Sequence, residues 1–145
     1  MKILEVLTKS RKTGNLGEKA AAKYLRRHGY KIMKRNFVAD GGEIDIIAEN
    51  KTTVALVEVK TRTLGKENPS EPRPASAVTP EKQRKIISAA RFYLGGFQSK
   101  RLRLDIVEVY LNADKSVNKI VHIENAFNFN TAFENPKSRK ANYIL

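Results

Sequence analysis

The sequence contains no cysteine and no tryptophan, and only 8% of its 145 residues are aromatic. Without cysteine the chain has neither a disulfide framework nor a thiolate metal site. No apolar run approaches the roughly 18 residues of a membrane-spanning helix, and the apolar stretch after Met1 is too short for a secretory signal. These absences predict a cytoplasmic protein with no membrane span.

Acidic residues are also scarce: 15 Asp and Glu stand against 28 Lys and Arg, which gives a net charge of +13. Such an excess favours a polyanionic partner, because Lys and Arg neutralise phosphates and release counterions. Simple solubility is the other explanation. The basic residues are scattered along the chain, which argues against a dedicated amphipathic membrane anchor. We therefore expect nucleic acid, and no membrane, as the partner.

The pattern of apolar and breaker residues predicts a single α/β domain over residues 1–145. A short helix or mobile arm (about 1–13) precedes a helix from Asn15 to about His28, and a basic tail (about 126–145) ends the chain. Thr79 is expected to cap a second helix that Gly95 ends. We expect strands at 30–38, 43–49, 54–60, 101–111 and 120–124.

The segment 62–78 contains Pro69, Pro72 and Pro74 and has few large aliphatic residues. It buries too little apolar surface to offset the entropy of ordering, about 1–2 kcal/mol per residue. We expect it to be mobile in the free protein and to order over nucleic acid, gating the site. A tolerated surface insertion is the alternative.

The strand "VALVEVK" (54–60) places Glu58 and Lys60 on the same face as apolar Val54 and Leu56, because strand side chains alternate. Burying such a pair costs several kcal/mol, roughly, unless something compensates. If 43–49 and 54–60 form a hairpin, a two-residue loop puts Asp45 diagonal to Glu58, and a four-residue loop puts it directly opposite. An odd loop would place Asp45 on the other face.

Asp45, Glu58 and Lys60 on one face are suited to phosphodiester chemistry. Mg²⁺ takes oxygen ligands and often only one or two carboxylates, which Asp45 and Glu58 supply, and the backbone carbonyl of Val59 adds a third ligand. Lys60 is then in reach of an attacking water or the scissile phosphate. The alternative is an edge-strand charge pair that discourages aggregation. Asp105 is expected to be a satisfied strand carboxylate, and neither His28 nor His122 has metal-ligand spacing.

Several separated blocks resemble the YraN-like proteins, which are grouped with the PD-(D/E)xK restriction-endonuclease-like superfamily and are similar to archaeal Holliday-junction resolvases. The blocks are "GE" (17–18), "RN" (35–36), "GEID" (42–45), "VEVK" (57–60), "VTPEKQ" (78–83) and "RLRLD" (101–105). The resemblance implies a restriction-endonuclease-like mixed sheet of about four to five strands flanked by helices. Residue 44 is Ile where the superfamily has Pro, at a position that varies widely.

By position, the resemblance implies that Asp45, Glu58 and Lys60 are the catalytic trio. Glu18 corresponds to the helix-one glutamate of the resolvases, a further metal ligand or supporting group, although an acid favoured by the helix dipole is the alternative. Gln83 corresponds to a polar position on the following helix that helps to position the site.

The resulting hypothesis is a nuclease that uses Mg²⁺ or Mn²⁺ on DNA, with branched DNA implied by the resolvase likeness and a homodimer implied by the two scissile strands of a junction. The rival is a non-catalytic nucleic-acid-binding protein with the same fold. The candidate phosphate contacts are Arg11, Lys12, Arg35, Arg62, Lys66, Arg73 and Lys82.

Overall fold

The structure is a computed structural model that describes residues 2–65, 78–95 and 99–127, with side chains from residue 14 onward. The described residues form two helices and five strands. In chain order these are α1 (Lys2–Arg27), β1 (Lys31–Ala39), β2 (Gly42–Glu49), β3 (Thr53–Thr63), α2 (Pro80–Leu94), β4 (Arg101–Leu111) and β5 (Val117–Phe127).

The strands form one mixed sheet in the order β1-β2-β3-β4-β5. Only β3 and β4 run parallel, and the other neighbours are antiparallel. A parallel pair needs a crossover connection, and α2 lies within that connection. The five-stranded mixed sheet flanked by helices confirms the expected fold class and is consistent with a restriction-endonuclease-like fold.

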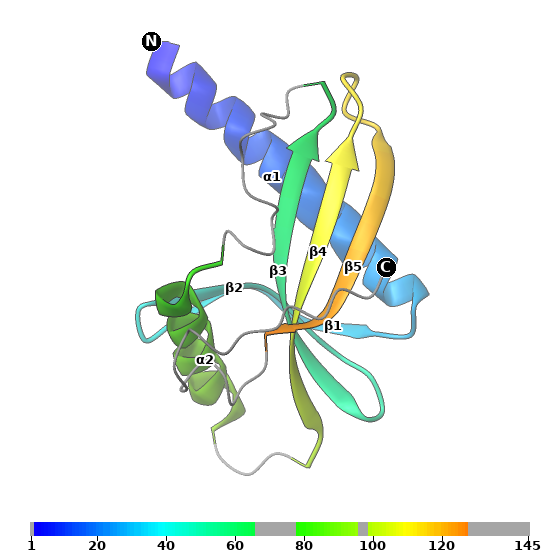
Figure 1. The fold of residues 1–145 in the computed structure, drawn as a ribbon. Helices are drawn as coiled ribbons and strands as arrows, with labels where there is room; N and C mark the ends of the chain where they lie inside the picture. The colour runs from blue at the N-terminus through cyan, green and yellow to red at the C-terminus, as the bar shows by residue number, and fades with distance from the viewer. Residues whose placement is uncertain (1, 66–77, 96–98, 128–145) are drawn as a thin grey trace.

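The two helices cover opposite faces of the sheet, and Figure 1 shows α1 passing behind β3, β4 and β5 while α2 lies beside β2. Ala21, Ala22 and Leu25 of α1 pack on one face in a buried cluster with Val57 and Val107, among others. The cluster on the other face joins α2 to the sheet through Ile86, Ile87, Ala89, Ala90, Ile47, Val54, Leu56, Leu104 and Ile106. The sheet is therefore buried on both sides.

The ends of α2 follow the residues that predicted them. Thr79 has extended backbone, and its side chain accepts a hydrogen bond from the Lys82 N–H at 3.2 Å. Gly95 has a φ of 68°, and its N–H bonds to the carbonyl of Arg91. A residue with a Cβ adopts that left-handed conformation at a cost, so glycine suits this helix end.

Some boundaries differ from the expectation. α1 begins at Lys2 and not at Asn15, so residues expected to form a separate arm continue the same helix. Helical periodicity predicts that Leu16 lies on the apolar face of this helix with Leu25, but Leu16 is 37% exposed, whereas Ala22 is buried. β3 runs on to Thr63, which puts Arg62 in a strand and not in the loop. The rest of the predicted mobile loop (66–77) and of the basic tail (128–145) lies outside the described residues.

Candidate active site

The hairpin of β2 and β3 has the four-residue loop, which was one of the two even-length alternatives. Glu49 pairs with Val54, and the ladder ends where Ile46 pairs with Val57. Continuing this register by one residue places Asp45 level with Glu58. The loop is held by Asn50, whose side-chain oxygen accepts the N–H groups of Thr52 and Thr53 at 3.0 and 2.8 Å.

The Asp45 side chain replaces a backbone acceptor at the point where the pairing of β2 with β3 ends. Its Oδ2 accepts the N–H of Val59 at 2.8 Å, in the place of a carbonyl from the neighbouring strand. In a strand the N–H and C=O of one residue face the same neighbour. The Val59 carbonyl, the predicted third oxygen ligand, therefore faces the Asp45 side of β3.

Asn36 of β1 has an unusual backbone conformation opposite Asp45. The pairs Arg35–Ile46 and Phe37–Ile44 place it opposite Asp45, and its φ is 52°. Asparagine tolerates this left-handed conformation better than most residues. Strict alternation along 43–49 predicts that Ile44 and Ile46 share one face. That prediction is wrong, because Ile44 packs on the α2 side whereas Ile46 packs on the α1 side.

The Asp45 carboxyl has a strongly perturbed acidity. Its pKa is raised from 3.8 to about 7, chiefly by burial and next by the negative charge of Glu58, with smaller upward contributions from the charge of Glu18 and a hydrogen bond to Glu58. The bond from the Val59 N–H opposes these effects. The negative charge of Glu58 therefore disfavours ionisation of Asp45, and a cation between the two carboxylates would relieve that repulsion.

Glu58 is held by two lysines. The Lys82 Nζ lies 2.6 Å from its Oε1, and the Lys60 Nζ lies 3.5 Å from the same oxygen. Glu58 is buried, and β3 is flanked on both sides by β2 and β4. The alternative of an edge-strand charge pair is therefore wrong, because β3 is not an edge.

Lys82 was expected to contact phosphate but lies within the carboxylate cluster. Burial alone would lower the pKa of its ammonium group. The hydrogen bond to Glu58 and the charges of Glu58 and Asp45 outweigh that effect, so the pKa of Lys82 lies above its ordinary value. Lys82 is therefore charged over the whole physiological range.

Glu18 reaches the edge of the cluster because α1 approaches β3 closely. A Cβ at Gly17 would lie 1.8 Å from the Thr61 Oγ1 and 2.9 Å from the Thr61 Cβ. Only glycine permits this approach. The Glu18 Oε2 is buried, lies 3.5 Å from an Arg35 guanidinium nitrogen and has no hydrogen-bond partner among the described residues.

The acidic groups do not make a complete metal site on their own. Among the described residues, no three histidine, cysteine, aspartate or glutamate side chains converge closely enough to hold an ion. Asp45 and Glu58 are together, whereas Glu18 stands near them and is paired with Arg35. The structure thus unites two of the expected carboxylates with Lys60 and places the third beside them.

Gln83 lies beneath the site and is fully buried. Its Nε2 donates to the Val78 carbonyl at 3.0 Å, while its Oε1 has no hydrogen-bond partner in the part of the chain described. A cavity of about 10 Å³ is lined by both Gln83 and Glu58, which is room for about one water molecule. Gln83 therefore adjoins Glu58 through this cavity.

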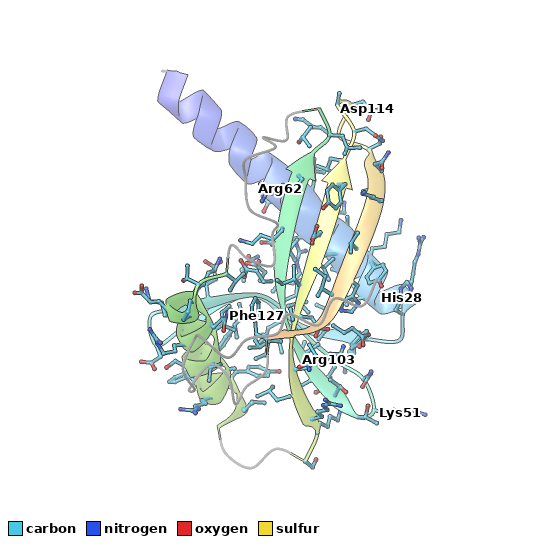
Figure 2. The ribbon with its side chains drawn as sticks, viewed as in Figure 1. His28, Lys51, Arg62, Arg103, Asp114 and Phe127 are labelled. Carbon is cyan, nitrogen blue, oxygen red and sulfur yellow. The ribbon has the colours of Figure 1, made fainter. Side chains whose placement is uncertain are left out.

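The other candidate phosphate contacts are dispersed. Arg11 and Lys12 lie in α1, where their side chains are not described, and Lys66 and Arg73 lie outside the described residues. Arg35 pairs with Glu18 at the site, and Arg62, labelled in Figure 2, extends from β3. A groove of about 340 Å³ adjoins the start of α2, lined by Lys82, Lys85, Glu81, Glu43 and the Gly41–Gly42 turn, among others.

A second buried polar cluster surrounds Asp105 and escaped the sequence analysis except for Asp105 itself. Arg103 binds both oxygens of this carboxylate at 2.8 Å, the His122 Nε2 lies 2.7 Å from it, and the N–H of Asn125 donates at 2.9 Å. The expectation of a satisfied strand carboxylate is confirmed. The spacing of Arg103 and Asp105 on one strand face was the available signal.

Comparison with known proteins places the chain in a family. The profile described as uncharacterised protein family UPF0102 matches residues 17–109. The chain belongs to the UPF0102 family. It is 45% identical to a UPF0102 protein of Caldanaerobacter subterraneus subsp. tengcongensis, covering 79% of this chain and 93% of that one. It is 43% identical to a UPF0102 protein of Geobacter metallireducens, covering 79% and 90% of the two chains.

The matched UPF0102 region runs from Gly17 to Val109 and so includes every member of the carboxylate–lysine cluster. The names of these relatives state no activity. Within the described ranges, no helix is long and apolar enough to cross a membrane.

Proposed function

We propose that this UPF0102 protein is a metal-dependent nuclease that hydrolyses phosphodiester bonds in DNA. The observation that supports this most directly is the meeting of Asp45, Glu58 and Lys60 where β2 separates from β3. Asp45 with a pKa raised to about 7 is an acid that a divalent cation would readily deprotonate. Groups with such perturbed acidity concentrate at functional sites.

The residues present fit Mg²⁺ or Mn²⁺. Asp45 and Glu58 would hold the ion with the carbonyl of Val59, and Glu18, whose Oε2 is buried without a hydrogen bond from any described residue, would support them. Mg²⁺ commonly uses one or two carboxylates and leaves positions for water and phosphate. When bound, the metal lowers the pKa of a water molecule and offsets charge on the phosphate.

The side chains of the chain itself supply the remaining parts. Lys60, 3.5 Å from Glu58, would donate to the attacking water or to a non-bridging oxygen of the scissile phosphate. Asp45 must be ionised to act as a ligand, so a proton competes with the ion, and metal affinity should rise with pH up to about 7. Gln83 would hold the Glu58 side of the site through the cavity that they share.

The polyanionic substrate follows from the +13 charge, and the resemblance to resolvases favours branched DNA cut by a homodimer in the cytoplasm. One observation favours the non-catalytic alternative, a protein that only binds nucleic acid. The positive charges of Lys60 and Lys82 already balance the negative charges of Asp45 and Glu58, so the site needs no metal ion for neutrality.

A cleavage panel tests the proposal. Branched, duplex and single-stranded DNA and RNA are incubated with Mg²⁺ or Mn²⁺ and with the wild-type protein, Lys60→Ala and the control Lys51→Ala. Lys51 lies in the exposed β2–β3 turn (Figure 2), and its substitution removes the same charge. We expect wild type and Lys51→Ala to cleave a DNA substrate and Lys60→Ala to lose at least about a hundredfold in rate. Binding without metal-dependent cleavage of any substrate would establish the alternative.

A further inference from the structure

Lys82 occupies one of the two positions on Glu58 that a cation would use. Its Nζ lies 2.6 Å from the Glu58 Oε1, closer than the Lys60 Nζ at 3.5 Å from the same atom. Lys60 comes from the same strand as Glu58, whereas Lys82 comes from the first turn of α2. The two ammonium groups therefore contact the same carboxylate oxygen but belong to different elements of the fold.

The charges in this cluster balance only because Lys82 is present. Asp45 and Glu58 contribute two negative charges when ionised, and Lys60 and Lys82 contribute two positive charges. A divalent cation on the same Glu58 oxygen would face both ammonium groups at close range. Like charges at such separations repel by about 1–4 kcal/mol for effective dielectric constants between those of water and the protein surface. Binding of the ion at this oxygen therefore favours movement of one ammonium away from it.

Lys82 is the lysine that can move. Its side chain is 44% exposed, against 23% for Lys60, and its flexible stem lets the ammonium swing without a backbone change. It also lines the open groove of about 340 Å³ at the start of α2. An ammonium that leaves Glu58 therefore has a solvent-filled place beside the cluster where a phosphate can meet it.

We propose that Lys82 is the counter-ion that a divalent cation displaces from Glu58, and that the displaced ammonium then binds a phosphate of the nucleic acid. This inference rests on the metal site of the proposed function and adds a coupling between its two ligands. Metal binding releases Lys82 for the phosphate, and phosphate binding holds Lys82 away from the metal. Each ligand then strengthens the binding of the other by the same factor, because such coupling is reciprocal.

The coupling gives Lys82 a signature that a plain phosphate contact lacks. Replacing Lys82 by Gln removes the competitor, so Mn²⁺ binding in the absence of DNA should tighten. A partly exposed ion pair of about 1 kcal/mol corresponds to about a fivefold lower Kd. The same substitution should weaken DNA binding and reduce the tightening of Mn²⁺ binding that DNA produces. Lys85 is the matched control, since it lies on the same helix and groove but pairs with Glu81 at 3.7 Å.

The experiment titrates the full chain with Mn²⁺ at pH 8, with free Mn²⁺ measured by electron paramagnetic resonance. Wild type, Lys82→Gln and Lys85→Gln are compared, and thermal unfolding checks that each variant is folded. A second series adds a four-way DNA junction to Lys60→Ala and to Lys60→Ala/Lys82→Gln, so that cleavage does not consume the DNA. We expect about fivefold tighter Mn²⁺ binding for Lys82→Gln alone, and a DNA-induced tightening that shrinks in the double variant.

The outcomes separate this inference from the proposed function. If wild type binds Mn²⁺ but Lys82→Gln binds it no more tightly than Lys85→Gln does, Lys82 is not a displaced counter-ion, and the nuclease proposal stands. Equal tightening by DNA in the presence and absence of Lys82 would also overturn the coupling. If wild type binds no Mn²⁺ even with DNA, the metal site and this inference fall together.

Discussion

The substitution Asp45→Asn should stabilise the metal-free protein at pH 8 and leave its stability nearly unchanged at pH 4. The introduced amide would keep an oxygen for the Val59 N–H, which Asp45 accepts at 2.8 Å. The nitrogen of that amide would donate to Glu58, as the protonated carboxyl does. The variant therefore imitates the neutral form of Asp45 at every pH, and only the ionised form should differ from it.

The sign of the effect follows from the direction of the pKa shift. The pKa of Asp45 is raised in the folded protein from 3.8 to about 7, chiefly by burial and next by Glu58. Below about pH 4 the carboxyl is neutral in both states, and its full contribution to folding is present. Between about pH 4 and pH 7 the carboxyl is ionised in the unfolded chain but still protonated in the folded protein. The free energy of unfolding therefore falls as pH rises from about 4 through 7.

The gain in the free energy of unfolding that Asp45→Asn should give has an upper limit and a smaller expected value. The separation between 3.8 and about 7 corresponds to about 4 kcal/mol at most, because each tenfold change is worth about 1.4 kcal/mol. The interaction of Asp45 with neighbouring charges and with solvent reduces this limit, and we expect about 2 kcal/mol above pH 7. That is a rise in Tm of about 4–8 °C for a chain of this size.

The assay is urea unfolding of wild type and Asp45→Asn at pH 4, 5.5, 7 and 8.5 with chelator present. The difference in the free energy of unfolding should grow from near zero to its full value across this range. Adding Mn²⁺ at pH 8.5 should restore stability to wild type and do little for the variant. A pH-independent difference, or a variant less stable than wild type at pH 8.5, would refute the electrostatic account of this site.

Further predictions concern the supports of the site and its ligand. Asn36 has a φ of 52°, a conformation that glycine adopts readily and valine does not. Asn36→Gly should therefore keep metal binding, whereas Asn36→Val should lose about 1–2 kcal/mol of stability and weaken Mn²⁺ affinity. Urea unfolding and Mn²⁺ titration check this. Gly17→Ala should lower Tm in a thermal scan, since its Cβ would lie 1.8 Å from the Thr61 Oγ1, and Gly14→Ala, with open space around it, is the control. Asp105→Ala should cost about 3–5 kcal/mol of stability at pH 7. Burial raises the pKa of the Asp105 carboxyl, but its hydrogen bonds and the Arg103 charge outweigh burial and hold the pKa below its ordinary value. Urea unfolding should therefore show the deficit shrinking below about pH 4. DNA affinity in a fluorescence anisotropy titration should fall steeply with salt and depend little on sequence; salt-independent binding would contradict a phosphate-dominated interface.

Much of the fold could be predicted because its signals are local. Thr79 and Gly95 mark the ends of α2 through capping chemistry that acts within one helical turn. The alternation in 54–60 identified a strand with one charged end. The pairing of Glu49 with Val54 was among the alternatives considered, since parity alone restricts a hairpin to a few registers.

The features that could not be predicted depend on contacts distant in sequence. Lys82 lies on the flank of the apolar side of α2, one turn before Ile86, and only the packing of α2 on the sheet brings it to Glu58. Ile44 and Ile46 lie on opposite faces of the sheet, on either side of Asp45, and Asn36 stands opposite in the neighbouring strand with a left-handed backbone. Asp105 binds Arg103 from its own strand, but its contact with His122 of β5 forms only in the folded sheet.

A charged pair in the middle of a sheet requires a reason beyond stability. Glu58 is buried in β3, which lies between β2 and β4, so protection of a sheet edge does not explain it. Buried ion pairs contribute little net stability relative to apolar residues of similar size, and Asp45 beside Glu58 adds repulsion. A site that destabilises the metal-free protein and gains stability from a cation is the arrangement expected of binding or catalytic machinery. We predict that Asp45→Asn raises the stability of the metal-free protein at high pH and that Mn²⁺ raises the stability of wild type. Both experiments therefore measure the same electrostatic repulsion in the metal-free site.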